Sequence, residues 1–310
     1  MTMVPSLLRP ALLALLALMF SVSGAHADSR EVVDAFGDTV TIPAQPQRIL
    51  TLSEIDLDIA LTLGVQPVGA INGRGQSTPP RYLLDRADDL NIVGDLGNPN
   101  LEKVLELQPD LILTSQDRPE MLELLRSIAP TVVTSQWGTP WKQTLAKVGE
   151  VLQREDEAAE FLAQYDDRIQ QVRTRLADHQ GDTISVVRWN PKGPAYMFRD
   201  SFASKIAREL GLVRPDHQQD EGYTHSLTLS LESLNLLDAD WLVIGTLSNT
   251  GDAVDAMTEA LATPAFAQLE AVQSGHYTAV DGSLWTSTGG PLAALQVIRD
   301  IESLITGQSD

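Results

Sequence analysis

The chain has 310 residues, more than one hydrophobic core usually holds, so two domains are expected. It carries 22 basic and 42 acidic residues, and its net charge of −20 repels phosphate backbones and anionic lipid, which argues against nucleic acid as a partner. Cysteine is absent, so we expect neither disulfides nor a lipid-attachment cysteine.

The first 27 residues have the features of a secretory signal peptide. They carry one charge, Arg9, followed by an apolar run over 11–20 that is too short to span a bilayer comfortably. Ala-His-Ala at 25–27 is the small-residue pattern that signal peptidase cuts after. We therefore expect the mature chain to start at Asp28 and to be a soluble, unanchored protein of a bacterial periplasm.

Residues 28–153 alternate between short apolar runs and amphipathic runs. Alternation over 31–42 around Gly37-Asp38 predicts a hairpin, which prolines at 43 and 46 end. After it, the predicted strands are 48–52, 67–70, 91–93, 111–114 and 131–134, and the predicted helices are 54–63, 101–107 and 119–128. Strands that alternate with helices predict a mostly parallel sheet covered on both faces.

The stretch from Glu150 to Gln180 contains no glycine or proline and predicts one long helix. Apolar residues recur three or four apart, at 159, 162, 165, 169, 172 and 176, which places them on one face. This helix is either a long core helix or a rod that joins two lobes, and the flanking patterns favour the rod. The predicted organisation is an N-terminal α/β lobe over 28–153, a linker helix over 154–180 and a C-terminal α/β lobe over 181–310.

Beyond the long helix the alternation of strands and helices starts again. The predicted strands are 183–188, 195–198, 240–245 and 276–280, and the predicted helices are 202–210, 252–261 and 291–305. Residues 100–113 also align without gaps with residues 230–243, which pairs Glu102 with Glu232 and Asp110 with Asp240. Any helix that runs into a strand could share the apolar matches, but an exposed Glu in both is not required by that pattern. We interpret the two halves as related α/β units.

Several ordered motifs together resemble the iron-siderophore substrate-binding proteins of ABC importers, and the resemblance covers nearly the whole mature chain. The motifs are Gly-Asp-Thr-Val-Thr-Ile-Pro at 37–43, Pro-Gln-Arg-Ile at 46–49, Leu-Gly-Val-Gln-Pro-Val-Gly at 63–69, Pro-Asn-Leu-Glu at 99–102, Leu-Gln-Pro-Asp-Leu-Ile at 107–112, Ile-Ala-Pro-Thr-Val at 128–132, Leu-Gly-Leu-Val-Arg-Pro at 210–215, Ser-Leu-Glu at 230–232, and Trp285 before Gly-Gly-Pro at 289–291.

The resemblance implies two doubly wound α/β lobes joined by one long linker helix, with a ligand cleft between them and little hinge motion. It implies a ferric siderophore as transported ligand, no cofactor, iron held by the chelator, a monomer, and an inner-membrane ABC permease dimer as partner. Glu102 and Glu232 match the family's two glutamates that dock on arginines of the permease. An exposed surface carboxylate without a partner is the alternative for each.

The ligand site is expected where the carboxyl ends of the strands leave a crevice. Guanidinium groups suit the oxygens of a ferric chelate because they stay charged and donate in a fork, and aromatic rings supply apolar walls. For each Arg the alternative is a surface ion pair, and for each Trp it is the core. The candidates are Arg74, Arg118, Trp137, Arg188, Tyr196, Arg199, Tyr223 and Trp285, with Arg118 and Arg188 favoured because similar proteins place arginines there.

Other functions have weaker support in the sequence. A haem or cobalamin carrier of the same fold is the main alternative, and a periplasmic hydrolase that uses the cleft is a further one. Gly73-Arg-Gly75 is followed by Thr78 where a dinucleotide fingerprint needs glycine, and no Gly-x-Ser-x-Gly elbow occurs. Some hydroxamate binders carry an Arg where this chain has Leu96, which argues against that binding mode.

Overall fold

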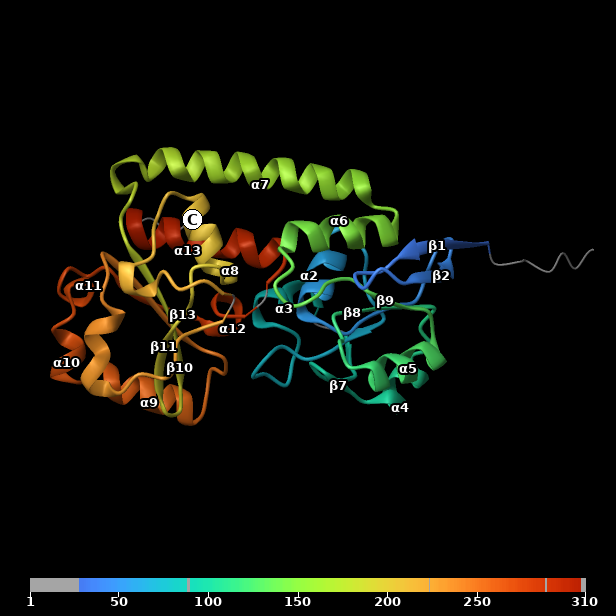
Figure 1. Ribbon diagram of the computed structural model, residues 1–310, viewed down its shortest axis with the longest axis horizontal. Coiled ribbons are helices and arrows are strands. Elements are labelled where there is room, and N and C mark those ends of the chain that lie inside the picture. The colour runs from blue at the N-terminus through green and yellow to red at the C-terminus, as the bar shows by residue number, and fades with distance from the viewer. Residues whose placement is uncertain (1–27, 88–89, 223, 288, 308–310) are drawn as a thin grey trace, which may run out of the picture.

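The computed structural model describes residues 28–87, 90–222, 224–287 and 289–307. Within them the chain forms two α/β lobes, one before and one after the helix α7 (Glu155–Arg175), which passes over both (Figure 1). This confirms the predicted fold class. The predicted signal peptide and Tyr223 lie outside the described residues.

The first lobe is built on a five-stranded parallel sheet of order β5-β4-β3-β8-β9. Its strands are β3 (Ile49–Thr51), β4 (Gly69–Ala70), β5 (Asn91–Ile92), β8 (Leu111–Thr114) and β9 (Thr131–Val133), and its helices are α2 (Glu54–Thr62), α3 (Leu84–Ala87), α4 (Leu101–Glu106), α5 (Pro119–Ile128) and α6 (Trp141–Leu152), with the 3-10 helix η2 at Arg81–Leu83. The predicted hairpin is present as β1 (Ser29–Val33) and β2 (Thr39–Pro43), and β6 (Gly94–Asp95) pairs with β7 (Asn98–Pro99). The neighbouring strands β3, β8 and β9 are buried throughout, as their apolar runs predict.

The second lobe is built on a four-stranded sheet of order β11-β10-β12-β13, in which only β11 is antiparallel to its neighbour. Its strands are β10 (Ile184–Asn190), β11 (Gly193–Tyr196), β12 (Trp241–Thr246) and β13 (Tyr277–Asp281). Its helices are α8 (Phe202–Glu209), α9 (Asp252–Leu261), α10 (Pro264–Ala267), α11 (Glu270–Gln273), α12 (Gly282–Trp285) and α13 (Pro291–Thr306), with 3-10 helices η3 (Ala177–His179), η4 (Asp216–Gln218) and η5 (Leu231–Leu237).

The predicted single helix over 150–180 is wrong at its start. Residues 150–152 end α6, and Gln153 then adopts a left-handed conformation (φ 53°) that separates α6 from α7. The buried face of α7 also begins one residue earlier than predicted, because Ala158 is buried and Ala159 is exposed. Farther along, Tyr165, Ile169 and Val172 are buried, as predicted.

The internal repeat has a structural counterpart in two aspartates that precede equivalent strands. Asp110, before β8, accepts hydrogen bonds from the backbone N–H groups of Gln47 and Arg48, both at 2.8 Å, at the start of β3. Asp240, before β12, accepts a 2.7 Å hydrogen bond from the backbone N–H of Thr183, at the start of β10. Because β8 pairs with β3 and β12 pairs with β10, both carboxylates fix the same strand pairing in their own lobe.

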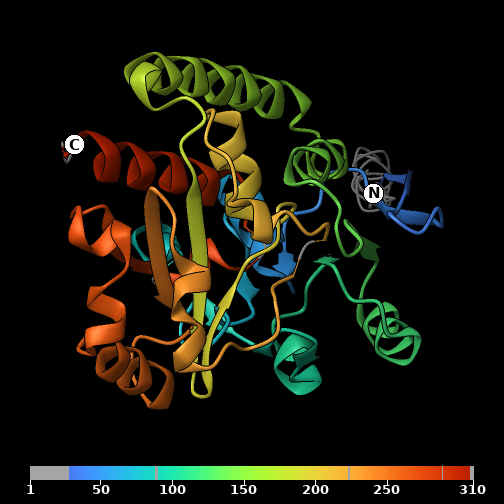
Figure 2. The same ribbon diagram turned by 60° about the vertical axis from the view of Figure 1, so that its left-hand side comes forward.

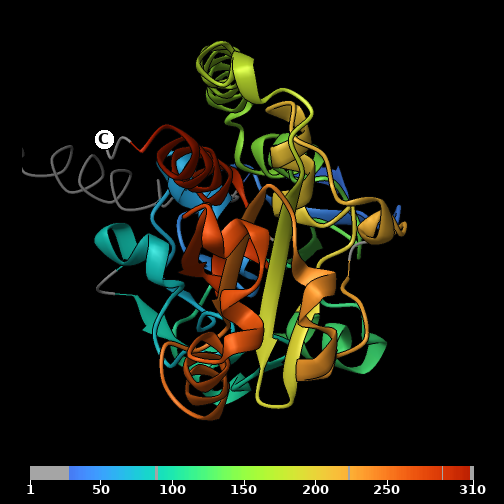
Figure 3. The same ribbon diagram turned by 90° about the vertical axis from the view of Figure 1, so that its left-hand side faces the viewer.

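The two lobes share more than α7. Helix α13 packs beside α7 and against α2 of the first lobe, and Figure 2 and Figure 3 show α7 and α13 running side by side. One apolar core cluster includes side chains of both lobes, such as Ile59, Tyr165 and Ile298. The linker helix is therefore one of two packed elements that connect the lobes.

Candidate functional site

A cavity of about 740 Å³ lies between the lobes and is lined by both. The first lobe lines it with segments that follow the carboxyl ends of its strands: 52–55 after β3, Arg74 after β4, 114–117 at β8 and 135–142 after β9. The second lobe contributes Arg188 of β10 and residues of the α8 region and of the segment after α12. The crevice at the strand ends is thus present, and its volume suits a small organic ligand.

Arg188 lines the cavity from the second lobe. Its Nε donates a 2.9 Å hydrogen bond to Thr286 Oγ1, and its Nη2 donates to the Thr286 carbonyl oxygen. Burial, together with repulsion by Arg74, lowers the pKa of Arg188 to about 10, so the guanidinium remains charged at neutral pH.

Arg74 lines the cavity from the first lobe, beside a buried carboxylate. Its backbone N–H donates a 2.6 Å hydrogen bond to Glu54 Oε1, and its Nε lies 3.9 Å from Glu54 Oε2. Burial raises the pKa of Glu54 above its usual value, and the charge and hydrogen bond of Arg74 oppose this shift. The Arg74 guanidinium is close enough to Arg188 to lower the pKa of the latter, so the two lobes present like charges to one space.

Arg118 lies beside the cavity rather than among the residues that line it. Its Nη2 donates to the Gly97 carbonyl oxygen and, at 3.2 Å, to Asn98 Oδ1, and its Nε lies 3.4 Å from Gln116 Oε1. Because Gly97 and Gln116 line the cavity, these bonds place Arg118 at its rim, with donors already engaged.

Trp137 provides an exposed aromatic surface at the cavity. It lies in the loop between β9 and α6, lines the cavity, and is 68% exposed, the largest exposed aromatic side chain of the described residues. An indole this open to solvent offers a flat apolar wall to a ligand.

Three other sequence candidates lie outside the cavity lining. Trp285 is fully buried and its indole N–H donates a 2.8 Å hydrogen bond to Asp300, so its predicted position in the cleft is corrected to the core. Arg199 forms ion pairs with Glu221 and, at 3.9 Å, with Asp200, the surface pairing that was its alternative.

Tyr196 likewise lies outside the cavity lining. Its hydroxyl donates a 3.3 Å hydrogen bond to the carbonyl oxygen of His217, and its ring packs edge-on against Phe198. Its predicted place in the cleft is therefore also corrected. Of the candidate ligand residues, the structure brings Arg74, Trp137 and Arg188 to the cavity and Arg118 to its rim.

Several ionisable residues of the cavity were not among the sequence candidates. These are Glu54, Asp117, Lys142, Asp200, Lys205, Glu209 and His225. Glu54 and Lys142 could have been found, because each follows a predicted strand, at the end where the crevice opens. Lys142 is paired with Glu209 at 3.3 Å. The lining is therefore mixed in charge rather than uniformly basic.

The two candidate docking glutamates are both exposed. Glu102 lies in the first turn of α4 and Glu232 in the first turn of η5, and neither forms an ion pair within the described part of the chain. Figure 1 shows α4 at the edge of the first lobe farthest from α7.

The described residues contain neither a cluster of metal ligands nor a membrane-spanning helix. No cluster of three or more His, Asp or Glu side chains there could hold a metal ion. Among the helices of these residues, none has the length and apolar character needed to cross a membrane.

Two α/β lobes that form a cavity at their strand ends define a bilobal ligand-binding protein. Residues 50–283 match the family model described as periplasmic binding protein, and the chain belongs to that family. The probable siderophore-binding lipoprotein YfiY of Bacillus subtilis is 33% identical over 89% of this chain and 87% of its own length. The achromobactin-binding periplasmic protein of Dickeya dadantii is 29% identical over 84% of this chain and 87% of its own.

A solved structure agrees with these relatives. The crystal structure of Staphylococcus aureus SirA complexed with staphyloferrin B matches with a TM-score of 0.77 at 28% identity, and covers 89% of this chain and 98% of that one.

Proposed function

We propose that this protein captures a ferric siderophore in the cavity between its lobes and delivers it to an inner-membrane ABC permease, without catalysing a reaction. One observation carries the proposal: Arg74 and Arg188 face the same cavity from opposite lobes of a chain whose net charge is −20. Two guanidinium groups that face one cavity repel each other, and an anionic ligand bound between them would offset this repulsion.

The chemistry of a ferric chelate suits this cavity. Its carboxylate, hydroxamate or catecholate oxygens accept forked hydrogen bonds from guanidinium groups, and its organic backbone can pack on Trp137. The names of the relatives agree with this ligand class, since YfiY is a probable siderophore-binding lipoprotein, the Dickeya protein binds achromobactin, and SirA was crystallised with staphyloferrin B.

Delivery to the permease is assigned to Glu102 and Glu232. Each is an exposed carboxylate in the first turn of a short helix, at matching positions of the repeat, and each is unpaired among the described residues. Two separated charges would fix both the register and the orientation of the protein on a symmetric partner. We place the mature protein in the periplasm, as a monomer; the relative YfiY is a lipoprotein, whereas this sequence contains no cysteine.

The test is a fluorescence titration with ferric citrate, ferric desferrioxamine and a ferric catecholate, with haem and cobalamin as competing ligand classes. We expect Arg188→Ala to weaken binding of the preferred ferric chelate by about 1.5–3 kcal/mol, the range for hydrogen bonds to charged groups. Arg199→Ala removes an equal charge outside the cavity and should leave the affinity unchanged. Binding of haem or cobalamin in preference to every ferric chelate would refute the proposal, and equal affinities for both variants and the wild type would remove Arg188 from the site.

A further inference from the structure

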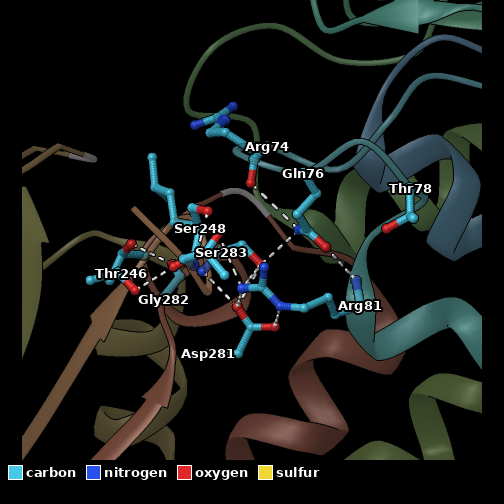
Figure 4. Close-up of polar contacts among 12 residues, drawn as sticks. Arg74, Gln76, Thr78, Arg81, Thr246, Ser248, Asp281, Gly282 and Ser283 are labelled. Carbon is cyan, nitrogen blue, oxygen red and sulfur yellow. Dashed lines mark hydrogen bonds and ion pairs between the residues drawn. The ribbon is translucent and has the colours of Figure 1, made fainter. Parts of the chain in front are cut away.

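A group of polar contacts joins the two lobes outside the cavity lining (Figure 4). Arg81 of the first lobe donates to Asp281 of the second through Nε (3.0 Å to Oδ2) and Nη2 (2.5 Å to Oδ1), and Nη2 also lies 3.3 Å from Ser283 Oγ. Gln76 Nε2 donates to the same Ser283 Oγ at 3.1 Å, while Gln76 Oε1 accepts from the backbone N–H of Arg81. We call these four residues, Gln76, Arg81, Asp281 and Ser283, the interlobe clamp.

The clamp is partly buried and closely packed, unlike an exposed surface ion pair. The side chains of Arg81 and Asp281 are only 22% and 26% exposed, so solvent screens their two-pronged ion pair less than a surface pair. The backbones also approach closely beside it: a Cβ added to Gly75, whose φ is +72°, would lie 2.9 Å from the carbonyl carbon of Leu247. Only glycine suits that backbone conformation and that approach.

Each side of the clamp is continuous with one arginine of the cavity. On the first lobe, Gln76 Nε2 lies 3.4 Å from the carbonyl oxygen of Arg74, two residues away. On the second lobe, Asp281 caps α12 by accepting from the backbone N–H of Ser283 at 2.9 Å. At the other end of α12, Thr286 holds the Arg188 guanidinium.

We propose that the interlobe clamp positions Arg74 and Arg188 across the cavity, so that Arg81, Asp281 and Ser283 are positioning residues for the ligand site. The clamp opposes a repulsion. Arg74 and Arg188 line one cavity from opposite lobes, and without a ligand their like charges, offset only in part by Glu54 beside Arg74, favour separation of the lobes on the side away from α7. A clamp that holds them near their bound spacing removes part of the ordering cost of binding. Its role in ligand binding rests on the proposed function, whereas its effect on the spacing of the lobes does not.

The spacing of the lobes can be measured without a ligand. Because the chain has no cysteine, spin labels can be attached at Glu123→Cys on α5 and Glu259→Cys on α9, which are exposed and lie in opposite lobes away from α7 (Figure 1). We expect electron–electron double resonance to give a narrow distance distribution for the otherwise wild-type chain. Asp281→Asn and Arg81→Gln should each lengthen and broaden it.

The matched control is Glu150→Gln, which removes one charge from the Lys147–Glu150 pair within α6 and should leave the distribution unchanged. A distance distribution that is the same in Asp281→Asn as in the wild type would contradict the proposal that the clamp fixes the spacing of the lobes.

The second measurement asks whether the clamp acts through Arg188. The probe is whichever of ferric citrate, ferric desferrioxamine and the ferric catecholate binds the wild type most tightly. We expect Asp281→Asn to weaken its binding about fivefold or more, and to have little further effect in a chain that already carries Arg188→Ala. Full additivity of the two changes would mean that Asp281 does not position Arg188. If the wild type binds no ferric chelate, the proposed function fails. The distance measurement still shows whether the clamp fixes the spacing of the lobes.

Discussion

Asp58 connects the lobes through one buried carboxylate. Its Oδ1 accepts from the backbone N–H of Leu292 at 2.8 Å, and its Oδ2 accepts from the N–H of Ala293 at 3.0 Å and from the hydroxyl of Tyr82 at 2.9 Å. A carboxylate at the N-terminus of α13 is favoured by the dipole of that helix. Burial nevertheless raises the pKa of Asp58 to about 6, because the loss of hydration outweighs the hydrogen bonds that favour the charged form.

This raised pKa makes stability depend on pH in a defined direction. The folded protein holds the Asp58 proton more tightly than the unfolded chain, so the contribution of this group is full below about pH 4 and is lost as pH rises through about 6. We expect the free energy of unfolding of the wild type, relative to that of Asp58→Asn, to fall by about 2 kcal/mol between pH 4 and pH 7. Urea unfolding at a series of pH values measures this. A constant difference would show that the hydrogen bonds cancel the effect of burial, and one that grows with pH would show that they outweigh it; either would contradict the raised pKa.

Residue identity predicted part of the site and missed the rest for identifiable reasons. Arg188 was predicted because it ends a predicted strand, at the edge where a crevice opens, and because similar proteins place an arginine there. Trp285 was misplaced because a motif does not show on which side of a short helix an indole points. Glu54 was missed because an acidic residue in the first turn of a helix is ordinary; its position after a predicted strand placed it near the crevice, but only the fold shows that it is buried there. The Arg81–Asp281 pair joins residues 200 positions apart, beyond the reach of any local pattern.

At the scale of elements, the strands and helices that the sequence predicted lie within a few residues of the observed ones, whereas helix α6 and its break from α7 were not predicted. Helix breaks are read from glycine and proline, whereas Gln153 adopts the left-handed conformation as a non-glycine residue, and its side chain donates a 3.1 Å hydrogen bond to the Ala44 carbonyl oxygen. Helix α6 could have been found, since its buried residues at 141, 145, 148, 151 and 152 follow a helical spacing.

The matching short elements α4 and η5 carry the proposed docking glutamates, and a transport assay tests them. Exposed ion pairs contribute about 0–1 kcal/mol each, so Glu102→Ala or Glu232→Ala alone should reduce labelled-iron uptake slightly, whereas the double variant should nearly abolish it. Chelate affinity in solution should not change. The charge-matched control is Glu106→Ala with Glu259→Ala, one exposed glutamate from each lobe. Normal uptake by the Glu102→Ala, Glu232→Ala protein would contradict the docking assignment.

At the scale of the whole molecule, the lobes are held at three places: α7, the contact of α13 with α2 and Asp58, and the interlobe clamp. Only the first was predicted from the sequence. The other two depend on how the C-terminal segment folds back onto the first lobe, which follows from tertiary packing. Three attachments around one cavity make a receptor whose binding groups are largely in place before the ligand arrives.

The location of iron tests the central claim most directly. Crystals of the protein with its preferred ferric chelate would be measured on both sides of the iron absorption edge, and the anomalous difference map would show where the metal lies. We expect one iron peak in the cavity between the lobes, within reach of chelate oxygens held by Arg74 and Arg188. An iron peak elsewhere, or ligand bound with Arg188 still directed only at Thr286, would contradict capture of a ferric chelate by the two opposed arginines.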